Sequence, residues 1–137
     1  MTKVFASCLL SGSAFDPSNA LRSISKLSFT EAHPPGAISK YTKQILEHGG
    51  AIINHPSNLG KTGKQIAWED MLAFLRKHHQ TLRACGVEDI NLTLNFFYPG
   101  DGASWHIEAE DIQALSQLGI GLSIDWYQIA EEQVYAD

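Results

Sequence analysis

The most informative absence in this chain of 137 residues is that of Lys and Arg from its C-terminal part. All ten basic residues lie at or before Arg83, together with five of the fifteen acids, so the net charge of residues 1–83 is +5. Residues 84–137 hold the other ten acids and have a net charge of −10, which gives −5 for the whole chain. Because phosphate binding depends on Lys and Arg, we expect no nucleic-acid partner there, and a cationic partner fits better.

Long hydrophobic runs are also missing. No stretch approaches the ~20 consecutive apolar residues that a membrane span needs, so we expect no membrane partner. The first 14 residues have the cation and the short apolar run of a weak signal peptide. That run is too short, however, and Phe15-Asp16-Pro17 directly after it is typical of a helix start. We therefore expect a cytoplasmic protein.

Cysteine is scarce, with only Cys8 and Cys85 in the chain. A disulfide between them is an alternative. Small cytosolic domains more often bury single thiols as small hydrophobic side chains, and this is what we expect here.

Catalytic and metal-binding motifs are missing as well. Residues 60–65 resemble a phosphate-binding loop, but that motif requires glycine and a hydroxyl residue at the positions of Asn58 and Gln65. The six histidines form no zinc motif. His106 with Glu108 is an alternative catalytic pair, although no nucleophile in a glycine elbow accompanies it. We expect no enzymatic activity, no metal and no cofactor.

Hydrophobic periodicity predicts the elements along the chain. Helical spacing predicts helices over residues 16–27, 67–85 and 108–118, and a shorter helix over 38–48 that Gly49-Gly50 would end. Alternation predicts strands over residues 4–10, 51–54, 90–96, 105–107 and 120–127. Residues 28–36 contain two prolines and predict a loop, and residues 59–65 predict a polar one.

This order of elements, with a polar face on the later strands, predicts an α+β fold. We expect a mostly antiparallel sheet with helices packed on one face. The chain would form a single globular domain over residues 1–137, with a variable middle segment at about 37–65 and a frayed tail or a short last turn over 129–137.

Five residues near the start of the last predicted helix are the candidate partner-binding site: Trp105, His106, Glu108, Glu110 and Asp111. An aromatic anchor beside exposed acids suits a protein interface. The simpler alternatives are a packing tryptophan and ordinary acids at a helix N-terminus, where the helix dipole favours them. A second candidate is the polar strand face of Asn91, Thr93, Asn95, Ser123 and Asp125, which would line a ligand pocket or simply face water.

Several segments together are similar to a known family. A strand followed by Phe15-Asp16-Pro17, a long helix from about Trp68, and a strand at 90–97 before a Gly-Asp-Gly turn resemble domain of unknown function 4279. Residues 107–112, 118–120 and 122–127 carry most of the resemblance, which covers roughly the whole chain. Between Ala37 and Gly63 the chain departs from the family's pattern of a basic extended segment and a Trp-containing strand. The resemblance implies a small bacterial α+β domain without an assigned catalytic site.

These observations predict a binding function. Our first hypothesis is a bacterial immunity protein that neutralises a cognate toxin by covering its active site. The −10 of the C-terminal part would steer a basic, nuclease-like toxin toward it. The alternative is a small-ligand-binding or regulatory module, and a hydrolase that uses His106 and Glu108 comes third.

Overall fold

The computed structural model describes residues 3–25, 27–54, 66–100 and 105–129. The loop predicted at 59–65 and residues 130–137 of the predicted tail lie outside these ranges. The elements in chain order are β1 (Lys3–Gly12), α1 (Pro17–Ser23), β2 (Phe29–His33), β3 (Gly49–Asn54), α2 (Ile66–Ala84), β4 (Asp89–Pro99), α3 (Ala109–Leu118) and β5 (Ile120–Ile129).

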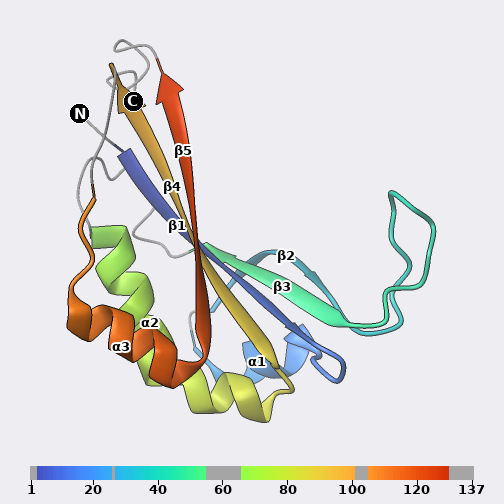
Figure 1. The fold of residues 1–137 in the computed structure, drawn as a ribbon. Helices are drawn as coiled ribbons and strands as arrows, with labels where there is room; N and C mark the ends of the chain where they lie inside the picture. The colour runs from blue at the N-terminus through green and yellow to red at the C-terminus, as the bar shows by residue number, and fades with distance from the viewer. Residues whose placement is uncertain (1–2, 26, 55–65, 101–104, 130–137) are drawn as a thin grey trace.

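The strands form one five-stranded sheet in the order β2-β3-β1-β4-β5. Every neighbouring pair is antiparallel except β4 and β5, which run parallel and are joined through α3. The three helices lie on one side of the strongly twisted sheet (Figure 1). The predicted α+β fold, with a mostly antiparallel sheet and helices on one face, is confirmed.

The core lies between this face and the helices, and strand alternation builds it. In β1 the side chains of Val4, Ala6, Cys8 and Leu10 are buried, and β4 buries every second residue from Ile90 to Phe96. From α2, Met71, Leu75 and Leu82 pack against them at 0% exposure. Each such large apolar side chain contributes about 1.5–3 kcal/mol on burial, so these two central strands and α2 hold the fold together.

The loop predicted over residues 28–36 is wrong in its first half. Residues Phe29–His33 form β2, which pairs with β3 through a register shift between Phe29 and Glu31. The two prolines follow the strand rather than interrupt it, since Pro34 and Pro35 come directly after His33. β2 thereby becomes one edge of the sheet.

The helix predicted over residues 38–48 is also wrong. Residues 34–48 form an extended hairpin, here called the arm, in which Ile38 and Ile45 face each other in an antiparallel bridge. The N–H of Gly36 donates to the carbonyl of Leu46, and the N–H of Leu46 donates to the carbonyl of Ala37, both at 2.7 Å. The helix-like spacing failed because an apolar stripe stabilises a helix only when it is buried. Here Ile38 is 68% exposed and Ile45 is 69% exposed.

The glycine pair after the arm does not end a helix but lies within β3. A Cβ on Gly49 would lie 1.6 Å from the carbonyl oxygen of Phe15, and one on Gly50 would lie 2.8 Å from the ring of His33. At Gly49 glycine is needed for this close approach of the backbone rather than for a left-handed turn, whereas at Gly50 the ring of His33 could move aside.

Two other boundaries differ from the predictions. Helix α1 ends at Ser23 instead of 27, because Ile24 turns to extended backbone and buries its side chain at 2% exposure. Residues 105–107 are irregular rather than a strand. Trp105 is held there by its ring contact with Phe96, at 5.6 Å between centroids, instead of by strand pairing.

Both cysteines are free, which confirms the expected single thiols over the disulfide. Cys8 is buried in the core, and desolvation raises the pKa of its thiol to about 12. Within the described ranges, no helix is both long enough and apolar enough to span a bilayer.

Candidate functional site

The segment that leads into α3 holds the five sequence-predicted site residues. Trp105 is half-buried and packs against Phe96, whose ring also stacks on Trp126 at 4.4 Å. Trp105 is therefore part of an aromatic cluster at one end of the core. It anchors the segment to the sheet and fixes where the acids that follow are displayed.

His106 and Glu108 form a pair at the surface. The Nε2 atom of His106 lies 3.3 Å from Oε1 of Glu108, and the two side chains are 79% and 67% exposed. Glu108 stands at the N-cap position of α3, but its carboxylate makes no capping bond; its backbone carbonyl accepts from the N–H groups of Asp111 and Ile112. An exposed pair of this kind contributes ~0–1 kcal/mol, and both side chains are accessible to a partner.

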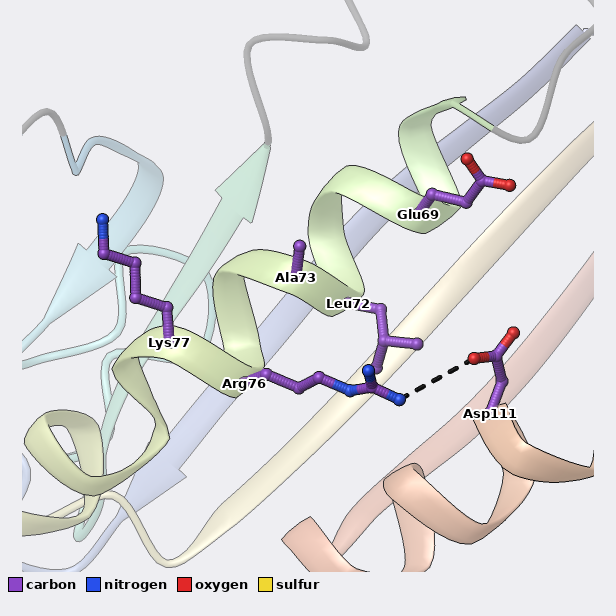
Figure 2. Close-up of a pocket in the computed structure, with 6 residues that line it drawn as sticks. All are labelled: Glu69, Leu72, Ala73, Arg76, Lys77 and Asp111. Carbon is purple, nitrogen blue, oxygen red and sulfur yellow. Dashed lines mark ion pairs between the residues drawn. The ribbon is translucent and has the colours of Figure 1, made fainter.

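Asp111 faces the neighbouring helix. Its Oδ1 atom lies 3.8 Å from the guanidinium of Arg76 on α2, and the side chains are 27% and 51% exposed. The pair bridges an open groove of about 550 Å³ between the helices (Figure 2). The groove is lined by Glu69, Leu72, Ala73, Arg76, Lys77 and Asp111.

The charges of this groove balance. Arg76 and Lys77 oppose Glu69 and Asp111, and Arg76 also lines an adjoining hollow of about 400 Å³ with Glu110. The strict division of charge along the sequence is thus not kept in space, because α2 brings basic residues beside the acidic start of α3. Glu108 lines neither hollow.

The second candidate, the polar strand face, lies on the side of the sheet opposite the helices. The amide of Asn91 donates to the hydroxyl of Ser123 at 3.1 Å and to that of Thr93 at 3.3 Å. Asn95 and Asp125 are register partners on the same face. Asn91, Thr93 and Ser123 thus hydrogen-bond to one another along the sheet, which suits a solvated face better than a set of groups converging on a ligand.

The chemistry available at these sites is limited. Among the residues that the structure describes, no group of three His, Cys, Asp or Glu side chains is arranged to hold a metal ion. The ring of His78 lies 4.8 Å from that of Phe74 in a tilted arrangement, and partial burial, with the nearby Lys77, lowers the pKa of His78.

Sequence reasoning missed the arm as a functional feature. Tyr41 at its tip is 81% exposed, so with Ile38 and Ile45 it presents three large apolar side chains to solvent. Figure 1 shows the arm projecting beyond the sheet, away from the helices. By the ~150–250 Å² scale of an aromatic side chain, the three together expose on the order of 400 Å², comparable with the largest apolar patch of a whole monomer.

The arm is internally bonded. The N–H of Ser39 donates to the carbonyl of Gln44 at 2.8 Å, and the N–H of Lys43 donates to the carbonyl of Ser39 at 2.9 Å. Lys43 takes a left-handed conformation, with φ of 61°, to close the turn. The ammonium of Lys40 lies 5.2 Å from the centre of the Tyr41 ring. The sequence does contain a signal for this hairpin. Pro34-Pro35-Gly36 precedes the separated apolar residues Ile38, Tyr41 and Ile45, and this order also fits a projecting hairpin.

Comparisons with known proteins add no relative to this picture. No protein-family model matches the chain, and neither a curated protein nor a solved structure is significantly similar to it. The resemblance to domain of unknown function 4279 stays a prediction.

Proposed function

We propose that this chain is a non-enzymatic protein-binding domain. The arm is the observation that carries the proposal: a hydrogen-bonded hairpin holds Ile38, Tyr41 and Ile45 in solvent at 68%, 81% and 69% exposure. An apolar patch of this size is as large as the largest patch on a typical monomer, and such patches are often functional. Covering ~400 Å² would contribute on the order of 10 kcal/mol before the costs of association. Tyr41 is of a residue type enriched among interface hot spots.

The partner that we propose is a basic, nuclease-like toxin, and the chain would act as its cognate bacterial immunity protein. Support comes from charge: the ten acids of residues 84–137 are matched by no Lys or Arg in that part, and Glu108 and Glu110 are exposed at the start of α3. Acidic side chains accelerate association with a basic protein through long-range attraction, whereas apolar contacts slow dissociation. In this proposal the arm supplies the apolar contact. Glu108 and Glu110, with Asp111 partly compensated by Arg76, lie on α3 away from the arm and attract a basic partner over a longer range.

The test is to find whether a toxin gene neighbours this one, to co-express and co-purify the two proteins, and to measure binding by surface plasmon resonance. Replacing Ile38, Tyr41 and Ile45 together by Ser should raise the dissociation rate at least ~100-fold, because three apolar contacts are removed. Replacing Glu108, Glu110 and Asp111 by Lys should lower the association rate and reverse its salt dependence.

Gln113→Lys is the matched control for the acid reversal, because it adds a charge to an exposed position of α3 without removing an acid. Unchanged affinity of the acid reversal at low salt would refute the placement of the partner at α3. If neither variant changes binding, or if no neighbouring protein co-purifies with the wild-type chain, the immunity proposal is wrong.

A further inference from the structure

The two edges of the sheet are built differently. The β2 edge has only five residues, carries the charge of Glu31 and is interrupted by a register shift. Short length, charge and irregularity are the features by which proteins prevent an edge strand from pairing with another chain. The β2 edge is therefore protected.

The β5 edge is neither short nor irregular. It runs for ten residues, Ile120–Ile129, in unbroken register with β4. It contains one charged residue, Asp125, and no Lys, Arg or Pro. Among the described residues no strand pairs with its outer side. A long, regular and apolar edge of this kind is a template for the addition of another strand.

The side chains of β5 are held in place for such pairing. Trp126 stacks on Phe96 at 4.4 Å, and Tyr127 stacks on Phe97 at 4.9 Å. Nevertheless Trp126 is 43% exposed and Tyr127 is 45% exposed, on opposite faces of the strand. The strand thus offers fixed aromatic surface on both faces, together with outer backbone groups that no strand of the described residues pairs with.

We infer that β5 pairs with β5 of a second copy of this chain, antiparallel across a two-fold axis, which gives a continuous ten-stranded sheet. If the two-fold axis is perpendicular to the sheet, the helices of both copies cover the same face of the joined sheet. In an antiparallel pair, two directly opposed residues point to the same face of the sheet. The axis must therefore pass at a residue position, where one residue lies opposite the same residue of the second copy.

Two registers pair the greatest length of the strand, one centred on Ile124 and one centred on Asp125. The second sets two carboxylates directly opposite each other, which is unfavourable. The register centred on Ile124 pairs residues 120–128 with residues 128–120 of the second copy and brings the isoleucines into contact. Charge therefore selects a single arrangement.

In that register the strand is complementary to itself. The hydroxyl of Ser123 stands opposite the carboxylate of the second copy's Asp125 and can donate to it. Leu122 meets the second copy's Trp126 on the helix face, and Gly121 leaves room for the second copy's Tyr127 on the other face. Each contact occurs twice because the axis repeats it. The side chains of β5 are therefore complementary to those of a second, antiparallel β5.

The first test is sedimentation equilibrium of the full chain from low to high micromolar concentration. We expect a dimer, and Ser123→Asp should raise its dissociation constant about tenfold or more, because two like-charge pairs are created across the axis. Ser123 is exposed, and the amide of Asn91 can donate to the introduced carboxylate as it does to the hydroxyl, so the monomer should keep its fold. The double variant Ser123→Asp with Asp125→Lys should restore the dimer, because the opposed charges are then unlike.

The second test reads the register. In a Cys85→Ser background, oxidised Ile124→Cys should form a disulfide-linked dimer, since position 124 faces its own copy. Ser123→Cys should not, because its copies are offset along the strands beyond disulfide reach. Cross-linking of Ser123→Cys but not of Ile124→Cys would overturn the register.

A wild-type chain that stays monomeric at every concentration overturns the proposal. So does a dimer that Ser123→Asp leaves intact but Tyr41→Ser dissociates, since that result places the contact on the arm. The outcome is independent of toxin binding, which is measured with a different partner and different variants.

Discussion

Arg83 near the end of α2 connects three segments of the molecule through backbone carbonyls. One guanidinium nitrogen donates to the carbonyl of Leu118 at 3.1 Å and to that of Gly119 at 3.4 Å. The second terminal nitrogen donates to the carbonyls of Val87 and Glu88, and Nε donates to Nε2 of His79 within α2 at 3.2 Å. These carbonyls belong to the end of α3 and to the turn before β4, so one half-buried cation binds the acceptors of both.

Replacing Arg83 by Met keeps most of the aliphatic stem and removes every donor. Hydrogen bonds to a charged group contribute about 1.5–3 kcal/mol each when well formed. Of the four contacts to backbone carbonyls, two are close and two are near the limit of hydrogen bonding; the fifth contact, to His79, lies within α2, and the site is partly solvated. We therefore expect the free energy of unfolding to fall by ~2–3 kcal/mol.

Urea unfolding followed by circular dichroism measures this change as the shift in midpoint multiplied by the m-value. Arg76→Met on the same helix is the control. Its single ion pair is 3.8 Å long and half exposed, so the loss should stay below ~0.5 kcal/mol. If Arg83→Met costs no more than Arg76→Met, the proposed connection of α2, α3 and β4 by this side chain is refuted.

Three further predictions concern pH, backbone contact and thiol reactivity. The N–H of Ser13 donates to the carboxylate of Glu88 and holds the pKa of Glu88 below its ordinary value. This stabilisation is present above the unfolded-state pKa of about 4.3 and is lost as pH falls through the lower folded value. Glu88→Gln should flatten the acid side of a plot of thermal midpoint against pH, and an unchanged slope would contradict the argument. A Cβ on Gly12 would lie 2.0 Å from the carbonyl oxygen of Gly86. Gly12→Ala should therefore lower the thermal midpoint more than Gly36→Ala, which meets no atom within 4 Å and costs only the strain of alanine at a φ of 87°. Equal shifts would show that the contact at Gly12 relaxes freely. In the native protein a thiol reagent should label half-buried Cys85. Cys8 is buried and its pKa is raised to about 12, so it should react only on unfolding. Equal labelling rates for the two thiols would disprove this.

The elements that the sequence predicted well are those whose pattern coincides with burial. Along α2 the residues Met71, Leu75 and Leu82 recur at helical spacing and all lie in the core. β4 alternates in the same way between the core and the polar face. In both elements the local preference and the tertiary environment require the same period, so the pattern alone was sufficient.

The arm could not be predicted by the same reasoning. Ile38, Tyr41 and Ile45 have the spacing of a helix face, but this spacing also fits a hairpin with its apolar residues near the tip. The choice depends on whether a surface is available to bury them, and periodicity carries no such information. β2 was missed because its outward residues, from Thr30 to Ala32, are all exposed and show no alternation.

The candidate site shows a different limit. The exposure of His106 and Glu108 followed from the sequence, since charged residues at a helix start face water. The ion pair of Asp111 with Arg76 did not, because it depends on how α3 crosses α2. Charge counted along the chain therefore overstates how far positive and negative surfaces are separated.

The central place of β1 has a consequence for synthesis of the chain. Its residues pair with β3 and with β4, and Lys3 finds its partner only at Phe97. At ~5–20 residues per second, the ribosome needs on the order of ten seconds to deliver that partner. During this time β1, which will become the middle strand of the sheet, exposes its apolar face and has no strand paired along the edge that β4 will occupy. In a nascent chain arrested before β4, this face and this edge remain exposed. Translational pauses upstream of residue 89 should therefore favour aggregation more than pauses downstream of residue 99.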